Sequence, residues 1–210
     1  MFTDRREAGK RLSIVLNKYR DKNCVVLAIP RGGVIVADEV CAALSAKMGL
    51  LITRKISAPG DEELAIGAVA PDGTTALDKE LIQDLFVRED YIQKEKKKQL
   101  KEIYKRVKKY RADKLPYTIK KRTVIVVDDG MATGFTIIAA IRYLKKKGAS
   151  KIVVATPVAP IEIVKKILEE ADDVAVLDTP NPFYAIGHFY KNFEQVPDEE
   201  VLAILKKYMI

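Results

Sequence analysis

The chain has 210 residues, of which 48% are apolar and 31% are charged, and its formal net charge is +8. This length and composition are typical of a single globular domain with a full hydrophobic core, and they exclude a largely disordered chain. The longest apolar runs are only as long as strands, and the first ten residues, MFTDRREAGK, contain no apolar stretch of the signal-peptide kind. We therefore expect a cytoplasmic protein with no membrane partner.

The positive charge is concentrated in one segment. Eleven Lys or Arg residues and three acids lie between Lys94 and Lys114, which accounts for the whole excess. A basic segment of this kind can bind RNA or another anionic partner, here over 94–122, but exposed Lys-rich helices are more commonly just solvated faces.

The first half of the chain alternates between helical and extended patterns. Apolar residues at helical spacing predict a helix over 4–19, with Thr3 or Asp4 as its N-cap. The elements expected next are a strand over 24–29, a Gly-rich turn over 30–33, a helix over 34–49, a strand over 50–53, a polar loop over 54–63 and a β-hairpin turn at 71–73. Cys24 and Cys41 lie in apolar surroundings without metal-ligand spacing, so we expect them to be small buried hydrophobic residues in a reducing compartment and assign them no chemistry.

The second half begins with a Lys-rich helical insertion over 78–114, which carries one narrow apolar stripe. The elements expected after it are a strand over 123–127, a helix closed by Gly148, a strand over 151–160, a helix over 161–171, a strand over 173–178 and a last helix capped by Asp198. Continuous apolar strands that alternate with helices predict one α/β domain over 1–210, with a mostly parallel sheet and helices on both of its faces.

The segment TVIVVDDGMATGFT, residues 123–136, carries the strongest chemical signal. Two carboxylates, Asp128 and Asp129, follow a buried strand and precede a loop of small residues. Ligands bind beyond the carboxyl ends of parallel strands, where helix N-termini present free N–H groups. Amides and threonine hydroxyls in the loop suit a monophosphate, and the carboxylates suit a ribose diol or hydrated Mg²⁺. This spacing favours a 5-phosphoribosyl group. The segment is neither a Walker A loop nor a dinucleotide-binding loop.

The stretch VIVVDDGMATGFT resembles the phosphoribosyl pyrophosphate (PRPP) signature of the type I phosphoribosyltransferases. Three further stretches, AIPRGGVIVADEV, RKISAPGDEELAIGAVAPDG and PFYAIGHFYKNFEQVPDEEV, resemble bacterial and archaeal phosphoribosyltransferases of unassigned acceptor. The resemblance implies the fold of that family, with a small hood over 179–197. It also implies Mg²⁺-dependent transfer of phosphoribose from PRPP to a nitrogenous base, a purine or a pyrimidine, with release of pyrophosphate. Family members are often homodimers, so a homodimer is the implied assembly.

The resemblance also implies roles for individual residues. Asp128 and Asp129 would hold the ribose hydroxyls and, through water or the ribose, Mg²⁺. Arg31 would neutralise the pyrophosphate, and Arg54 with Lys55 would precede a mobile loop, ISAPGDEE, that closes over the site. These five residues form the implied catalytic set. The implied PRPP-binding set is Pro30, Arg31, Gly32, Gly33, Asp128, Asp129, Gly130, Met131, Ala132, Thr133, Gly134, Phe135 and Thr136.

The acceptor base is less well defined. Ala132 stands where hypoxanthine-guanine enzymes have an acid, and no Lys follows the strand over 151–160, so the resemblance disfavours a 6-oxopurine. Phe183 or Tyr184 in the hood could stack on a planar base, or could equally be core residues. His188 is a candidate general base, although a lone histidine in an aromatic loop is more often structural.

Two other classes of function remain open. A PRPP-sensing regulator would keep the same site and act through RNA or DNA, with 94–122 as its contact surface and a steep dependence of binding on salt. A degenerate assembly subunit is the third hypothesis, and the intact Asp128, Asp129, Thr136 and Arg31 argue against it.

Overall fold

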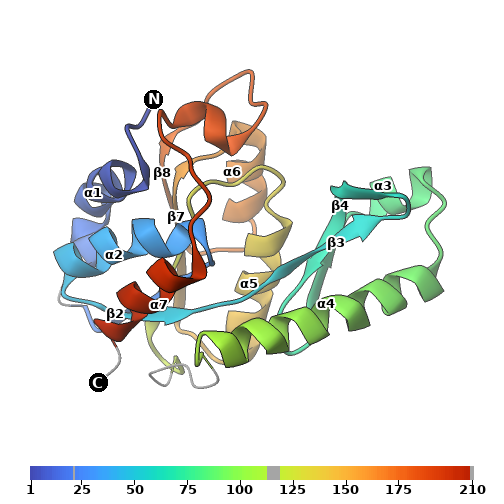
Figure 1. Ribbon diagram of the computed structural model, residues 1–210, viewed down its shortest axis with the longest axis horizontal. Helices are drawn as coiled ribbons and strands as arrows, with labels where there is room; N and C mark the ends of the chain where they lie inside the picture. The colour runs from blue at the N-terminus through green and yellow to red at the C-terminus, as the bar shows by residue number, and fades with distance from the viewer. Residues whose placement is uncertain (21, 113–118, 209–210) are drawn as a thin grey trace.

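The computed structural model describes residues 1–20, 22–112 and 119–208. Its central strands are β1 (Cys24–Ala28), β2 (Lys47–Leu50), β6 (Thr123–Val127), β7 (Lys151–Val158) and β8 (Asp173–Asp178). They form a five-stranded sheet in the order β2-β1-β6-β7-β8, and every pairing in it is parallel. Figure 1 shows this sheet between α2 and α5. The predicted parallel α/β sheet is therefore confirmed.

Helices cover both faces of this sheet. One face carries α1 (Arg5–Leu16), the short 3-10 helix η1 (Asn17–Tyr19), α2 (Gly32–Leu44) and α7 (Asp198–Lys206), and the other carries α5 (Phe135–Lys146) and α6 (Ile161–Leu168). Val26 packs with residues of α1 and α2, whereas the next residue, Leu27, packs with residues of α5. Successive strand residues point to opposite faces. Both faces are buried, which explains the continuous apolar runs in the sequence.

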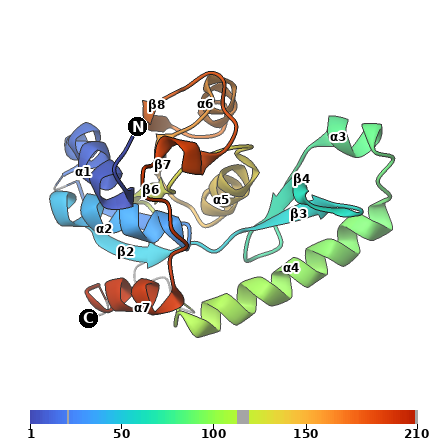
Figure 2. The same ribbon diagram turned by 45° about the horizontal axis from the view of Figure 1, so that its top comes forward.

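A second, antiparallel sheet projects from this core. It consists of β3 (Arg54–Ala58), β4 (Asp61–Val69) and β5 (Thr75–Leu77), in that order. Helices α3 (Lys79–Asp84) and α4 (Glu89–Lys109) follow, and α4 runs back along the sheet toward α7 (Figure 2). We call residues 54–109 the arm. The predicted hairpin turn at 71–73 is present in it, with Gly73 N–H donating to the Ala70 carbonyl at 2.9 Å.

Four local predictions are wrong. The segment 54–63 is a β-hairpin that turns at Pro59 and Gly60, where a polar loop was expected. The helix expected over 34–49 ends at Leu44, because residues 47–49 pair with β1 as a strand. That second strand therefore spans 47–50 instead of 50–53. Asp198 is the first residue of α7 and does not cap it, since its carboxylate contacts Lys109 and Tyr110 of the α4 end.

Other local predictions are confirmed. Asp4 caps α1 by accepting from the N–H of Glu7 at 2.8 Å, and both cysteines are buried free thiols. In the described part of the chain, no helix is long and apolar enough to cross a membrane. Residues 94–109 of the basic segment lie in α4, and residues 113–118 lie outside the described residues.

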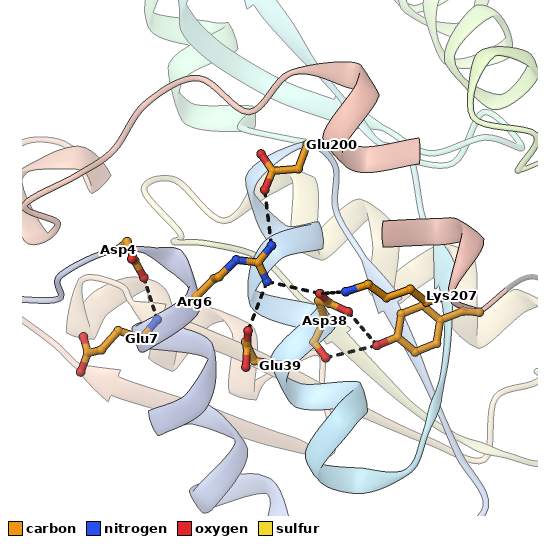
Figure 3. A network of polar contacts seen from close by, with 8 residues as sticks. Asp4, Arg6, Glu7, Asp38, Glu39, Glu200 and Lys207 are labelled. Carbon is orange, nitrogen blue, oxygen red and sulfur yellow. Dashed lines mark hydrogen bonds and ion pairs between the residues drawn. The ribbon is translucent and has the colours of Figure 1, made fainter. Parts of the chain in front are cut away.

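A polar network fastens α7 to α2. Asp38 of α2 has a side chain only 7% exposed, and its carboxylate accepts from Lys207 at 2.7 Å and from the Tyr208 hydroxyl at 2.8 Å (Figure 3). Arg6 of α1 approaches the same carboxylate at 3.4 Å and Glu39 at 3.2 Å. These contacts join α1, α2 and the end of the α7 segment on one face of the sheet.

Candidate active site

Two loops that follow adjacent strands meet at one edge of the sheet. Ala28 at the end of β1 pairs with Val127 at the end of β6, so the Gly-rich turn and the acid pair emerge side by side. A Cβ atom built on Gly32 would lie 1.8 Å from Oδ2 of Asp129. Only glycine therefore allows the two loops to approach this closely. The peptide bond between Pro30 and Arg31 is cis.

The two adjacent carboxylates have different surroundings. Asp128 Oδ1 accepts from the N–H of Asp129 at 2.8 Å, and burial together with the Asp129 charge raises the pKa of Asp128 well above its usual range. Oδ2 of Asp129 accepts from Nε of Arg5 at 2.7 Å, and the Asp129 carbonyl accepts from the Tyr190 hydroxyl at 2.6 Å. Sequence reasoning missed Arg5 and Tyr190, because they lie 124 and 61 residues from Asp129 and no local pattern links them to it.

The loop after the acids leads directly into α5. Gly134 precedes the helix with φ +75°, a left-handed conformation that favours glycine. Because Gly134 has no side chain to cap the helix, the first amides of α5 are available to an anion. Met131 is buried and its N–H donates to the Val158 carbonyl at 2.9 Å, which anchors the loop on the neighbouring strand.

A cavity of about 970 Å³ lies between this edge of the sheet and the arm. It brings together eight of the predicted site residues: Pro30, Arg31, Gly32, Arg54, Lys55, Asp128, Asp129 and Thr136. The other predicted PRPP-binding residues in the described chain do not line it: Gly33, Gly130, Met131, Ala132, Thr133, Gly134 and Phe135. The cavity thus unites the acid pair with cations from two different parts of the fold.

Helix α4 supplies a wall of the cavity that the sequence did not predict. The residues that it contributes are Tyr91, Glu95, Lys98, Gln99, Glu102 and Arg106. Nε of Arg54 donates to Oε1 of Gln99 at 2.9 Å, and burial followed by the nearby charge of Arg106 lowers the pKa of Arg54. The polar side chains of this wall recur at helical spacing, so they share one face of α4. This spacing is the sequence signal that could have identified them as a group.

The other predicted cations have looser contacts. Nζ of Lys55 lies 3.7 Å from Glu63 across the hairpin, and Nη1 of Arg31 lies 3.9 Å from Oδ1 of Asp198. The side chain of Lys55 is about half exposed at 48%, whereas that of Arg31 is 27% exposed. Both cations therefore face the cavity without a close carboxylate contact at these atoms.

The hood segment contains the 3-10 helix η2 (Ile186–Phe189) and lies beside the acid loop. The Phe183 ring packs 5.0 Å from that of Phe189, whereas Tyr184 is 77% exposed, with its ring 6.3 Å from the exposed His188. Among the described residues that line the cavity, neither Phe183 nor Tyr184 occurs. Phe183 contributes to apolar packing, and base stacking by these two rings stays a prediction.

Comparison with known proteins identifies the family. A family model described as phosphoribosyl transferase domain matches residues 5–185. Two Mycobacterium tuberculosis proteins with the provisional name phosphoribosyl transferase are 39% identical over 99% of this chain. The match covers 47% of each relative, so the chain spans about half the length of these curated relatives. A uracil phosphoribosyltransferase of Staphylococcus haemolyticus is 46% identical over 63 residues, which is 30% of each chain.

Two solved structures show that the fold of this chain occurs in other proteins. A Thermus thermophilus protein superposes with a TM-score of 0.82 at 38% identity and covers 99% of both chains. A Neisseria gonorrhoeae hypothetical protein solved with bound ppGpp has a TM-score of 0.52 at 14% identity, covering 99% of this chain and 98% of its own, which shows a shared fold alone. The sheet, the acid-pair loop and the family match lead to one conclusion. This chain belongs to the phosphoribosyl transferase family.

Proposed function

We propose that the chain is a Mg²⁺-dependent phosphoribosyltransferase that moves 5-phosphoribose from PRPP to a nitrogen of a base and releases pyrophosphate. The observation that carries this proposal is the cavity that Asp128 and Asp129 line together with Arg31, Arg54 and Lys55. Vicinal carboxylates suit the ribose diol, and a group of cations suits the anionic leaving group. That geometry supports this specific activity beyond family membership alone.

The donor would bind with its two ends in different surroundings. The 5′-phosphate would lie at the α5 N-terminus, where Thr136 lines the cavity and the first helical amides point outward. The pyrophosphate would lie toward Arg31 and Arg54, beside the Gly32 turn. Cleavage of the C1′–O bond places charge on pyrophosphate while the ribose becomes oxocarbenium-like. Preorganised cations therefore stabilise the transition state more than the ground state.

The donor set fits a Mg²⁺ ion that is shared with the substrate. Among the described residues, no group of three or more His, Cys, Asp or Glu side chains is placed to hold a metal. Mg²⁺ is commonly bound through one or two carboxylates, with water and substrate phosphates completing its coordination. Asp128 and Asp129 could hold the ion in this way, and the ion would neutralise charge on pyrophosphate.

The acceptor remains a nitrogenous base of either class. Ala132 is exposed at the position where a purine enzyme could carry an acid, which supports the case against 6-oxopurines. The similarity to a uracil phosphoribosyltransferase over 63 residues makes a pyrimidine a natural first candidate. The cavity is large enough for a donor and a planar base together.

The direct test is a pyrophosphate-release assay with PRPP, Mg²⁺ and a panel of purines, pyrimidines and other nitrogen acceptors. We expect turnover with at least one acceptor, and its loss on removal of Mg²⁺ by a chelator. PRPP binding without turnover on the whole panel would contradict the transferase and favour a PRPP-sensing regulator, especially if salt-sensitive RNA or DNA binding were also found.

The site assignment has its own test. The double variant Asp128→Asn with Asp129→Asn should keep the fold and lose most PRPP affinity, because it replaces both carboxyl groups of the proposed ribose site. The matched control is Asp178→Asn, an exposed carboxylate at the end of β8 that does not line the cavity. Calorimetry that found unchanged Mg²⁺-dependent PRPP affinity in the double variant would overturn the assignment.

A further inference from the structure

Helix α4 buries two polar side chains against the arm hairpin. Glu95 is 9% exposed and Gln99 is 6% exposed, although most of the helix surface is basic and solvated. Burying a polar group costs free energy unless hydrogen bonds replace its water. Burial of these two side chains therefore implies specific contacts that offset its free-energy cost.

Their hydrogen bonds lead to a cation of the cavity. Nε2 of Gln99 donates to Oε1 of Glu95 at 2.6 Å, which fixes the orientation of the amide. Oε1 of Gln99 then accepts from Nε of Arg54 at 2.9 Å. The protein thus holds the guanidinium of Arg54 by its Nε edge, and that contact does not use the terminal nitrogens, which form the fork that binds oxyanions.

A second guanidinium lies on the same wall. Arg106 is seven residues after Gln99, about two helical turns along the same face of α4, and it lines the same cavity as Arg54. The two cations are close enough that the charge of Arg106, after burial, lowers the pKa of Arg54. The charges of Glu102 and Glu95 on the same helix act on the pKa of Arg54 in the opposite direction and so offset part of the repulsion between the two cations. An anion between the two guanidiniums would relieve the repulsion that remains.

We propose that Arg106 joins Arg54 in binding the pyrophosphate end of the donor. Gln99 and Glu95 are positioning residues, which hold Arg54 toward that anion. The inference rests on the proposed function and adds α4 of the arm to the leaving-group site. It commits to an anion with two phosphoryl groups, because two separated guanidiniums match two groups of oxyanions.

The experiment uses inorganic pyrophosphate with Mg²⁺ as the probe of one half of the site and ribose 5-phosphate as the probe of the other. Gln99→Met removes the acceptor of Arg54 at similar length, and Arg106→Gln removes the second cation. Each should weaken pyrophosphate binding at least about tenfold, the effect of losing a charged hydrogen bond, and leave ribose 5-phosphate affinity within about threefold. Lys108→Gln, which removes an exposed cation of the same helix, is the control.

A rescue variant separates positioning from general stability. Exchanging the two residues, Glu95→Gln with Gln99→Glu, keeps the charge and both hydrogen bonds, with the amide donor now at position 95. Pyrophosphate affinity should return to within about threefold of wild type, since the acceptor of Arg54 is restored. Melting curves confirm that each variant is folded.

The outcomes distinguish failure of this inference from failure of the proposed function. If wild type binds neither pyrophosphate nor ribose 5-phosphate, the proposed function fails. If wild type binds both and Gln99→Met and Arg106→Gln leave pyrophosphate affinity unchanged, the inference alone fails. Equal losses of both affinities in Gln99→Met would show that the contact is merely structural and would also overturn the positioning role.

Discussion

The close approach of Gly32 to Asp129 makes Gly32→Ala a sharp test of the site geometry. The new methyl group would lie 1.8 Å from Oδ2 of Asp129 and 2.7 Å from Nε of Arg5, whereas ordinary contact begins at 3.4 Å. The carboxylate must therefore retreat by about 1.6 Å, which is the difference between those two distances for Oδ2. Such a movement breaks its 2.7 Å bond to Arg5, whose side chain is only 11% exposed.

We expect Gly32→Ala to lose about 1.5–3 kcal/mol of stability, the range for a hydrogen bond to a charged group. It should also lose ribose 5-phosphate affinity, because Asp129 no longer faces the ligand. Urea unfolding and calorimetry measure the two effects separately. The control is Gly148→Ala, where φ is +80° and the added Cβ would meet only the Lys120 side chain at 3.4 Å, so it should cost stability through backbone strain alone. Wild-type stability and affinity in Gly32→Ala would refute the geometry.

Two further predictions concern the supports of the site and of α7. Tyr190→Phe leaves the Asp129 carbonyl without its 2.6 Å donor and should cost about 1 kcal/mol in urea unfolding; an unchanged midpoint would show that the bond is absent in solution. Burial alone would raise the pKa of Asp38, but hydrogen bonds from Lys207 and Tyr208 lower that pKa overall. The ionised carboxylate therefore stabilises the folded state at pH values above the unfolded pKa of Asp38. This stabilisation is lost as the pH falls through the folded pKa. Asp38→Asn should therefore be about 1–3 kcal/mol less stable than wild type at pH 7, with the difference shrinking below about pH 4, and a pH-independent difference would contradict the linkage.

The parallel sheet and the acid loop could be predicted because their signals are local. Strands buried on both faces have no polar alternation, so they appear as continuous apolar runs such as 123–127. The acids at 128–129 and the small residues after them lie within one loop, where spacing alone determines which groups share the strand end. Three of the eight predicted residues that line the cavity, Asp128, Asp129 and Thr136, come from this loop, whereas the other five were implied by the family resemblance and not by local spacing.

The arm hairpin was missed for a physical reason. The first residues of β4, Asp61–Leu64, are exposed and mostly acidic, a composition that is depleted in strands. Their extended conformation comes from pairing with β3, and Pro59 with Gly60 forms only the tight turn between them. A Pro-Gly pair flanked by charges is equally typical of a loop, so sequence pattern could not decide between the two.

The site residues that sequence reasoning missed depend on contacts between distant segments. Helical spacing shows that Glu95 and Gln99 share a face of α4, but burial of that face depends on where the hairpin packs. Asp198 shows this dependence on distant segments most clearly, because its carboxylate accepts from the hydroxyl of Tyr110, which lies 88 residues away in the sequence. As the first residue of a helix, Asp198 resembles a capping acid in the sequence. Only the tertiary structure shows that its carboxylate contacts Lys109 and Tyr110 at the end of α4 instead.

The same contacts explain why the arm forms one wall of the cavity instead of a separate module. The Tyr91 hydroxyl of α4 donates to the Ser57 carbonyl at 3.1 Å, which joins the start of the helix to the hairpin. At its other end, α4 meets Asp198 of α7, the same residue that lies 3.9 Å from Arg31. The cavity wall is thus fastened to the hairpin on one side and to α7, beside the Gly-rich turn, on the other. An insertion held in this way can place a guanidinium against the donor, which a freely hinged helix could not do without losing conformational entropy on binding.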